Sequence, residues 1–598
     1  MEEIDFFYSE GINNKNNQPV KKTSRLKKLV LKLLPKKTTI ANLPRVLNVK
    51  QRYLILGLFL VIIVSAVYIP ISAYRKATNL TPDFGGKYTE GLVGEPRYIN
   101  PLLASTDSDR DLSSIIYSGL MKSDGKGGFV PDLTQSYEIS SDGLTYTFFL
   151  RKNVLWHDGE AFTAEDVAFT ISLAQNSDYS TSQKLTWQGV TVKELNDYAI
   201  ELTLKNKYAQ FISSTTIGIL PAHIWRDSKP TNFALSEANL KPIGTGPYMF
   251  SSFKKDSLGK IENYELKSNK DYYNSRPYIN KIVFRFYNSE DETIKAYNQN
   301  AVDGISFISG ENLDKIKFKS KLSIEKLNLP RYFAVFFNQN RSKYLADKNI
   351  RLALSYGTDK DKIIKDIFNE EAIKADSPVL PSMFNINSDI KKYEYDLDFA
   401  QKILKNTGWE DNDNDGILEK TTKNVTEELE IELTTSDWPE LIRVANALKE
   451  QWAKIGVKLN LQIADITEVQ QLIKDRTYQS LLFGEVLGVD PDPFSFWHSS
   501  QKKDPGLNLA LYDNSSADKI LEEARQTLAL SERTKKYNDF QNILIEDVPA
   551  IFLYSSYYIY PIPKKVQGFD TTLIGVPADR FSNIENWYID TKRAKKND

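Results

Sequence analysis

The longest uncharged segment of the chain lies near its amino terminus and follows a run of basic residues. Residues 53–74 contain no charged side chain over 22 positions, whereas residues 21–52 contain eleven basic side chains and no acidic one. At about 1.5 Å of rise per residue, such a helix crosses the roughly 30 Å hydrocarbon core of a bilayer. Because basic flanks stay on the cytoplasmic side, the pattern predicts a cytoplasmic tail (1–52), a single-pass transmembrane anchor (53–74), a linker (75–86) and an extracytoplasmic body.

Two other interpretations of this segment stay open, a cleaved signal peptide and a buried core helix. A signal peptide is disfavoured because its basic region would be about 52 residues long and its apolar run would exceed the roughly 7–15 residues that are usual. Ile71, Ser72 and Ala73 also form a poor small-x-small cleavage site. The predicted location is therefore the cell membrane, with the amino terminus in the cytoplasm.

In the remainder of the chain, apolar positions follow helical and strand periods in turn. A helical stripe runs through Leu441, Ala445, Leu448, Trp452 and Ile455. Gly456 stands where a left-handed cap is needed, and residues 457–463 then alternate between apolar and polar side chains, as in a half-buried strand. A capping-box pattern starting at Thr163 predicts another helix from about residue 164. Interleaved patterns of this kind are typical of an α/β protein.

The composition narrows the possible functions. The chain has 598 residues, which favours more than one domain. It has no cysteine, which excludes disulfides, cysteine-ligated metals, a cysteine nucleophile and a lipid-modified cysteine. The first 52 residues hold twelve basic and four acidic side chains, so the remainder keeps 65 basic and 74 acidic ones. This acidic body gives no reason to expect nucleic-acid binding.

One acidic segment matches the start of a calcium-binding loop. Oxygen ligands stand at its first, third and fifth positions, namely Asp411, Asp413 and Asp415. Gly416 follows at the turn position, but the twelfth position is Thr422 instead of the usual glutamate, and Glu419 lies between them. A structural Ca²⁺ site and a plain turn rich in aspartate and asparagine both stay open.

The sequence contains few of the residue patterns that catalytic sites require. The three histidines, His157, His223 and His498, lie far apart, and no nucleophile elbow, phosphate-binding loop or zinc-protease pattern occurs. His498 stays a weak candidate for binding a metal or a metal chelate. We therefore predict that the protein is not an enzyme and requires no cofactor.

Longer strings then resemble a known family. Residues 130–171 read VPDLTQSYEISSDGLTYTFFLRKNVLWHDGEAFTAEDVAFTI, and they are followed by GTGPY at 244–248, AKIGV at 453–457 and EDVP at 546–549. In content, order and spacing these strings are similar to the family-5 extracellular solute-binding proteins, the binding components of peptide, oligopeptide and nickel ABC importers. The resemblance extends over about residues 92–560.

The resemblance implies a two-lobed α/β fold of the periplasmic-binding-protein type (type II) with an extra amino-terminal subdomain, preceded here by one transmembrane helix. The expected boundaries are lobe I at 87–330 with an inserted subdomain at 130–240, lobe II at 331–550, and a return to lobe I with a tail at 551–598. The implied function is to capture peptides, oligopeptides in particular, between the lobes and to deliver them to the permease subunits of an ABC importer. We expect a monomer.

The resemblance also suggests ligand-binding residues, with one departure from the family pattern. Where the family's peptide binders have an aspartate for the ligand's amino group, this chain has Val489. Asp490 and Glu485 are the nearby acidic candidates, although Asp490 would face the opposite side of a strand from Val489, and the absence of such an anchor stays open. The other candidates for the cleft are Asn338, Phe483, Trp438 and Trp497. Burial in a core is the competing interpretation for each aromatic residue.

Three other functions compete with peptide import. A sensory ectodomain would use the same cleft and its transmembrane helix to report a ligand, but about 52 cytoplasmic residues without an enzyme domain favour a plain anchor. A binder of a small polar solute other than a peptide would use the same fold. A glycosidase or peptidase is disfavoured by the missing catalytic patterns.

Overall fold

The computed structural model describes residues 48–596 except 180, 182, 382 and 384–389. The described chain separates into two compact units, one made of residues 48–81 and 593–596 and the other of the described residues within 82–592. We call them the stem and the body. Most of the predicted cytoplasmic tail lies outside the described residues.

The stem is built on one long helix, α3 (Val49–Ala77), which has no buried residue. Among the described residues it is the helix that is long and apolar enough to cross a membrane. It is longer than the predicted span of 53–74 because the basic flanks are helical too. Strand β1 (Thr78–Pro82) follows directly and pairs with β23 (Thr591–Lys595) near the end of the chain. The predicted linker at 75–86 is therefore helix and strand rather than irregular chain.

Lobe I of the body contains a five-stranded sheet in the order β12-β2-β11-β10-β9. Its strands are β2 (Gly85–Val93), β9 (Tyr248–Lys255), β10 (Ile261–Ser268), β11 (Ile279–Tyr287) and β12 (Gly304–Ile305). The helices beside it are α4 (Asp107–Ile116) and α10 (Glu290–Asn298). Parallel pairing of β2 with β11, more than 180 positions later, shows that lobe I is assembled from distant segments.

The inserted subdomain of lobe I has its own four-stranded antiparallel sheet, in the order β5-β6-β8-β7. Its strands are β5 (Thr134–Ile139), β6 (Thr145–Leu150), β7 (Thr191–Asn196) and β8 (Ala199–Thr203). Helix α5 (Ala164–Gln175) covers this sheet and begins where the capping box predicted, with Thr163 as its cap. Between lobe I and this subdomain lie the short strands β3 (Met121–Ser123) and β4 (Phe129–Pro131).

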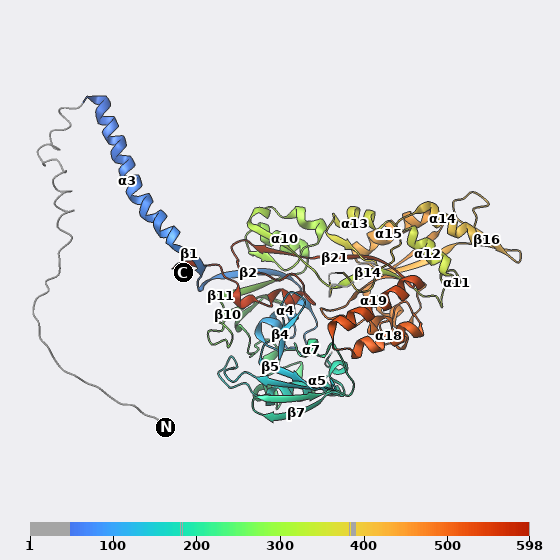
Figure 1. Cartoon of the computed structure of the whole chain (residues 1–598), viewed down its shortest axis with the longest axis horizontal. Helices are drawn as coiled ribbons and strands as arrows, with labels where there is room; N and C mark the ends of the chain where they lie inside the picture. Colours follow the sequence, from blue (N-terminus) through green and yellow to red (C-terminus); the bar gives the residue numbers. More distant parts are fainter. Residues whose placement is uncertain (1–47, 180, 182, 382, 384–389, 597–598) are drawn as a thin grey trace, which may run out of the picture. The chain divides into compact units, whose positions relative to one another are not determined.

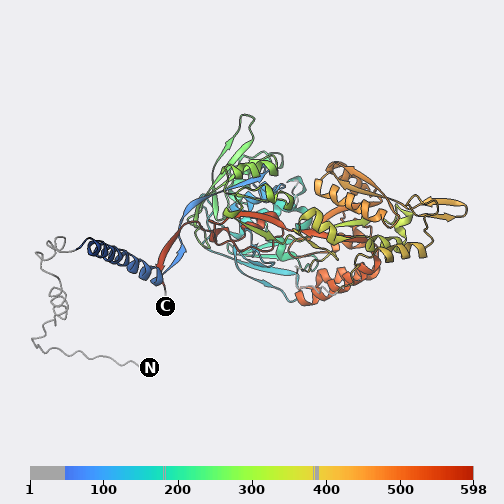
Figure 2. The same cartoon turned by 90° about the horizontal axis from the view of Figure 1, so that it is seen from above.

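Lobe II is a six-stranded sheet with helices on both faces, in the order β15-β21-β14-β20-β18-β19. Its strands are β14 (Arg331–Phe337), β15 (Ala372–Lys374), β18 (Glu430–Ser436), β19 (Lys458–Ala464), β20 (Ser480–Val486) and β21 (Ala550–Ser556). Helices α12 (Lys348–Tyr356), α13 (Lys360–Phe368), α14 (Leu397–Asn406) and α15 (Pro439–Ala453) lie on one side, and α18 (Ser515–Gln526) and α19 (Leu530–Asp547) on the other (Figures 1 and 2).

Strand β14 is buried on both faces, as this layering requires. Phe333 and Val335 belong to the core under α12–α15, whereas Tyr332 and Phe336 belong to the core under α18 and α19. The predicted unit of a helix at 441–455 followed by a strand at 457–463 is present as α15 and β19. The hairpin of β16 (Glu419–Thr422) and β17 (Val425–Glu428) projects at the far end of lobe II (Figure 2).

Two short crossings join the lobes. One runs from β13 (Leu322–Leu327) into β14, and the other runs from β21 into β22 (Tyr558–Pro563). Strands β13 and β22 pair on the lobe I side, and β14 and β21 pair on the lobe II side, so the crossings run side by side. Because β21 belongs to the lobe II sheet as far as Ser556, the chain returns to lobe I near Tyr557 rather than at residue 551.

Candidate functional site

A cavity of about 470 Å³ lies between the lobes, beside both crossings. Lobe I contributes the end of β2, the first turns of α4 and residues 306–312, whereas lobe II contributes the end of α13 and the start of α15. Leu329, Arg331 and Ser556 come from the crossings themselves. We call it the hinge cavity, and closure of the lobes would enclose a ligand there.

Aromatic rings form one wall of the hinge cavity. Trp438, a predicted cleft residue, lines it and remains 45% exposed. Its ring meets the edge of Phe333 at 6.2 Å between centroids, and Phe333 stacks on Tyr554 at 4.8 Å. Phe333 and Tyr554 are buried and support the Trp438 ring from behind, while Trp438 itself stays open to the cavity and can cover an apolar part of a ligand.

Two oppositely charged side chains face the same space from lobe II. Arg331 donates from Nη2 to Oγ of Ser556 at 2.8 Å, which ties the two crossings together. Burial lowers the pKa of Arg331, while Glu440 is the carboxylate that does most to raise it. Glu440 accepts a hydrogen bond from the Tyr554 hydroxyl at 2.9 Å, and burial raises its pKa. No sequence pattern singled out Arg331 or Glu440.

A buried ion cluster supports the lobe I side of the cavity. Arg580 binds Asp111 through both guanidinium nitrogens, at 2.7 and 2.6 Å, and Glu90 at 2.7 Å. Tyr88 and Tyr560 donate to the other oxygen of Glu90 at 2.6 and 2.8 Å. Burial raises the pKa of Asp111 to about 6, against the lowering effect of Arg580. The cluster fixes the carboxy-terminal segment to α4, and its partners are too far apart in sequence for a local pattern to reveal it.

A second cavity, of about 550 Å³, lies within lobe I between α4 and the inserted subdomain. Lys122, which lines it, pairs with Glu585 at 2.8 Å. Tyr273 donates to Asp132, another lining residue, at 2.5 Å. This cavity lies in one lobe, so closure of the lobes does not by itself enclose it.

The segment 488–492, where the family pattern led us to look for an amine site, carries paired charges. Asp490 binds Arg533 of α19 at 2.8 Å, and Asp492 binds Arg525 of α18 at 2.7 Å. Burial raises the pKa of Asp490 to about 6, while Arg533 opposes this. Val489 packs against Gly575 of lobe I so closely that an added Cβ there would lie 2.9 Å from the valine Cγ2. Amine binding by Asp490 stays a prediction.

The remaining predicted cleft residues lie within lobe II. Glu485 is buried in β20, where it accepts a hydrogen bond from the Tyr332 hydroxyl, and burial raises its pKa well above the usual range. Phe483 and Trp497 pack in the core under α18 and α19. Asn338 is buried and donates to the carbonyls of Arg476 and Tyr478 at 3.1 and 2.9 Å. Of the six predicted ligand-binding residues, Trp438 alone lines either cavity described above.

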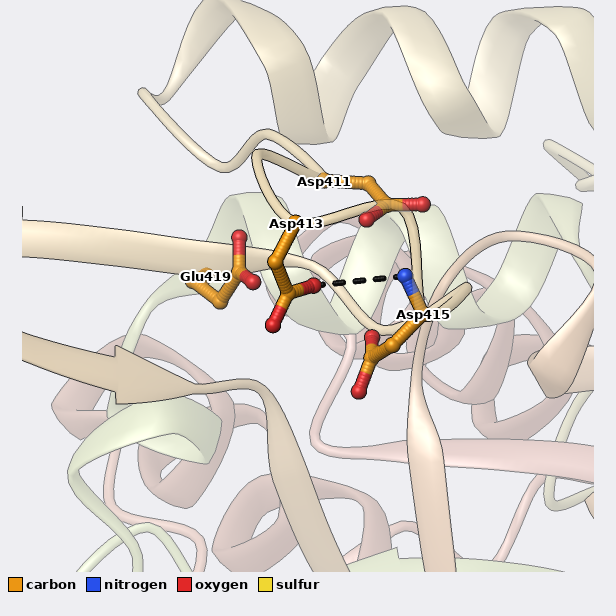
Figure 3. Close-up of side chains that lie close together, drawn as sticks. All are labelled: Asp411, Asp413, Asp415 and Glu419. Atoms are coloured by element: carbon orange, nitrogen blue, oxygen red, sulfur yellow. Dashed lines mark hydrogen bonds between the residues drawn. The ribbon is translucent and has the colours of Figure 1, made fainter.

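The acidic loop between α14 and β16 brings four carboxylates together. Asp411, Asp413, Asp415 and Glu419 each offer an oxygen, all within 4.8 Å of one another (Figure 3). The Asp415 amide donates to Asp413 at 3.2 Å, while Glu419 is buried and accepts from the Asn412 amide at 2.9 Å. Such oxygen ligands suit a hard cation such as Ca²⁺. Calcium binding stays a prediction.

Comparisons with known proteins agree with the resemblance seen in the sequence. Residues 128–508 match the family model of the bacterial extracellular solute-binding proteins, family 5 Middle. The oligopeptide-binding protein AppA of Bacillus subtilis is 27% identical over 556 residues, 90% of this chain and 99% of that protein. The dipeptide-binding protein of Escherichia coli is 25% identical over 517 residues, 82% of this chain and 93% of that protein.

Solved structures share the fold. The structure of AppA from Bacillus subtilis in complex with a nonapeptide has a TM-score of 0.68 and covers 85% of this chain and 100% of its own. NikZ from Campylobacter jejuni, in complex with Ni(L-His), has a TM-score of 0.69 at 30% identity and covers 84% of this chain and 99% of its own. The predicted two-lobed α/β fold is confirmed by these neighbours.

Proposed function

Because this chain belongs to the bacterial extracellular solute-binding proteins of family 5, we propose that it captures peptides between its two lobes and delivers them to the permease of an ABC importer. The observation that carries the proposal is the hinge cavity, which both lobes and both crossings line. The peptide-binding relatives AppA and the dipeptide-binding protein support the choice of ligand class. The protein performs no chemistry on what it binds.

The cavity can both enclose a ligand and release it. Its walls come from separate lobes that are joined by two crossings, so a rotation at Leu329 and Tyr557 would open it to water. The exposed ring of Trp438 would cover ligand side chains, and the charged groups beside it would bind the polar ends. Monomeric action follows from this design, since one chain supplies the whole cavity.

We also propose that α3 anchors the protein in the cell membrane as a single span with the amino terminus in the cytoplasm. The helix is long and apolar enough, and none of its residues is buried. The eleven basic residues at 21–52 favour this orientation by the positive-inside rule. Since the chain has no cysteine to carry a lipid, this helix would hold the protein beside its permease.

Binding to a defined peptide pool tests the proposed function. The full chain, purified in detergent, is titrated with alanine-based oligopeptides of graded length while tryptophan fluorescence and calorimetric heat are followed. Trp438 lies half-exposed in the cavity, so its emission should shift as a ligand covers it. Failure of every length to bind would count against peptide capture.

A second candidate ligand class is a metal chelate of an amino acid. The observation in its favour is the 30% identity to NikZ, whose structure contains Ni(L-His). Titration with nickel and histidine together, compared with each alone, distinguishes this ligand from a peptide.

A further inference from the structure

Arg331 stands out among the charged side chains of the hinge cavity because no carboxylate of the described residues lies within ion-pair distance of it, although Glu440 favours its charged form from farther away. Its Nη2 bonds to the neutral hydroxyl of Ser556 at 2.8 Å, and its guanidinium lies over the Phe333 ring at 5.4 Å. Its Nε is buried without a hydrogen-bond partner in the part of the chain that the structure describes. A buried guanidinium without a paired carboxylate is costly, because it has lost water and gains only a longer-range attraction to Glu440.

The acidic side chains of the same cavity are already engaged. Six carboxylates line it: Asp111 pairs with Arg580, Glu311 with Arg443, Glu371 with Lys326 and Asp107 with Arg110, while Glu290 accepts from the Ser309 amide and Glu440 from the Tyr554 hydroxyl. Arg443, the other arginine of the lining, is thereby neutralised. Arg331 is left as the lining cation that has no carboxylate partner among the described residues.

We infer that Arg331 binds a carboxylate of the ligand that the hinge cavity encloses. A carboxylate accepts charge-assisted hydrogen bonds from the planar guanidinium, and the Nε of Arg331 has no partner among the described residues. A more highly charged anion such as a phosphate would meet the repulsion of the six lining carboxylates. The inference rests on the proposed function, because it assumes that the ligand lies in this cavity.

The position of Arg331 also links binding to closure. It is the first residue of β14, directly after one crossing, and its partner Ser556 is the last residue of β21, directly before the other. A ligand carboxylate held there would touch both crossings at the point where the lobes turn. A ligand that is held there and also contacts the lobe I wall of the cavity would favour the closed arrangement of the lobes.

A ligand carboxylate has two possible sources, the carboxy terminus of a peptide or an acidic side chain, and two arms of one experiment separate them. In the first arm, the full chain is titrated with alanine-based oligopeptides that carry a free carboxy terminus and with the same peptides amidated. In the second arm, all peptides are amidated, and one glutamate is compared with one glutamine. We expect the carboxylate form in one arm to bind about 10- to 100-fold more tightly.

The Arg331→Gln variant should lose that preference while it still binds the uncharged peptides as the wild type does. The matched control is Arg226→Gln, which removes a guanidinium that is paired with Glu165 in the inserted subdomain, outside the hinge cavity, and should keep the full preference. Should Arg331→Gln fail to fold, Arg331→Lys replaces it; this variant keeps the charge, loses the planar fork and should keep about a tenth of the preference.

Specific results would overturn the inference. If the carboxylate and neutral peptides bind equally in both arms, the inference is overturned, but peptide capture still stands. The inference is also overturned if the Arg331 variants keep the full preference for the carboxylate form. If the wild type binds no peptide at all, the proposed function fails, and the inference fails with it.

Discussion

The hinge cavity and the segment 488–492 both hold buried charges, but they differ in how those charges are paired. In the segment, Asp490 and Asp492 each have an arginine partner from the helices α18 and α19 of the same lobe. In the cavity, Arg331 contacts a hydroxyl and an aromatic ring, and Glu440 acts on it only from farther away. A buried charge that its own lobe pairs makes the loss of its partner costly, whereas a charge without a close partner beside a cavity is free to bind something else. The two regions therefore differ in whether their buried charges have a close ion-pair partner, and not in the kinds of residue that they contain.

The largest expected difference between the regions is in stability. Arg533→Met leaves Asp490 buried without its cation and should lower the free energy of unfolding by about 3–5 kcal/mol. Arg331→Met removes an uncompensated charge and should change that free energy by less than about 1 kcal/mol. Chemical denaturation of both variants measures the difference, and equal losses would contradict the distinction.

The next expected effect is a dependence of stability on pH. Burial raises the pKa of Asp490 to about 6, with Arg533 lowering it and Asp492 raising it. The folded state therefore holds this proton at a pH where the unfolded chain, in which the pKa of aspartate keeps its ordinary value near 3.8, has lost it. The contribution of Asp490 to stability should be present at about pH 4 and fall by about 2 kcal/mol as the pH rises through 6.

Comparison with Asp490→Asn isolates this contribution, since Asp111 and other buried carboxylates titrate in both proteins. The free energy of unfolding of the wild type minus that of the variant should fall by about 2 kcal/mol between pH 4 and pH 7. A constant difference would show that Asp490 keeps an ordinary pKa.

A smaller effect, on the melting temperature, is expected at the acidic loop 411–419. Its carboxylates lie next to one another, unlike the arginine-paired aspartates of the segment 488–492. Its carboxylates converge on one point, as a cation would require (Figure 3). Saturating Ca²⁺ should raise the melting temperature by about 2–4 °C relative to chelator. Asp413→Asn should abolish the increase, and a melting temperature indifferent to chelator would favour the plain turn.

The smallest expected effect is on peptide affinity at the segment 488–492. Since Arg533 already holds Asp490, the Asp490→Asn variant should bind peptides within about twofold of the wild type. Calorimetric titration checks this. A large loss, confined to peptides with a free amino terminus, would instead make Asp490 the amine ligand.

The sequence predicted those parts of the molecule whose causes are local. Three such predictions depend on residues only a few positions apart, and each has its counterpart in the structure. They are the capping box at Thr163, the helix predicted from the apolar spacing between Leu441 and Ile455, and the acidic loop. The family strings predicted the two-lobed fold. The stem was only half predicted, because β23 comes from the other end of the chain to pair with β1.

The candidate site was mostly not predicted, for a physical reason. Trp438 lines the hinge cavity, whereas Asn338, Glu485 and Trp497 are buried within lobe II, and ligand binding by each of them stays a prediction. Arg331 carries no motif, and its significance lies in a missing partner, which no single sequence displays. Likewise Arg580 and Asp111 meet only in the folded chain, 469 positions apart.

The paired crossings also determine how the two lobes are able to move. Because β13 is hydrogen-bonded to β22, and β14 to β21, neither crossing can slide past the other without breaking a register on both sides. Torsion of the few residues between these ladders leaves both registers intact. The lobes therefore reorient by rotation about the two crossings, and a ligand that bridges them would fix the angle of that rotation.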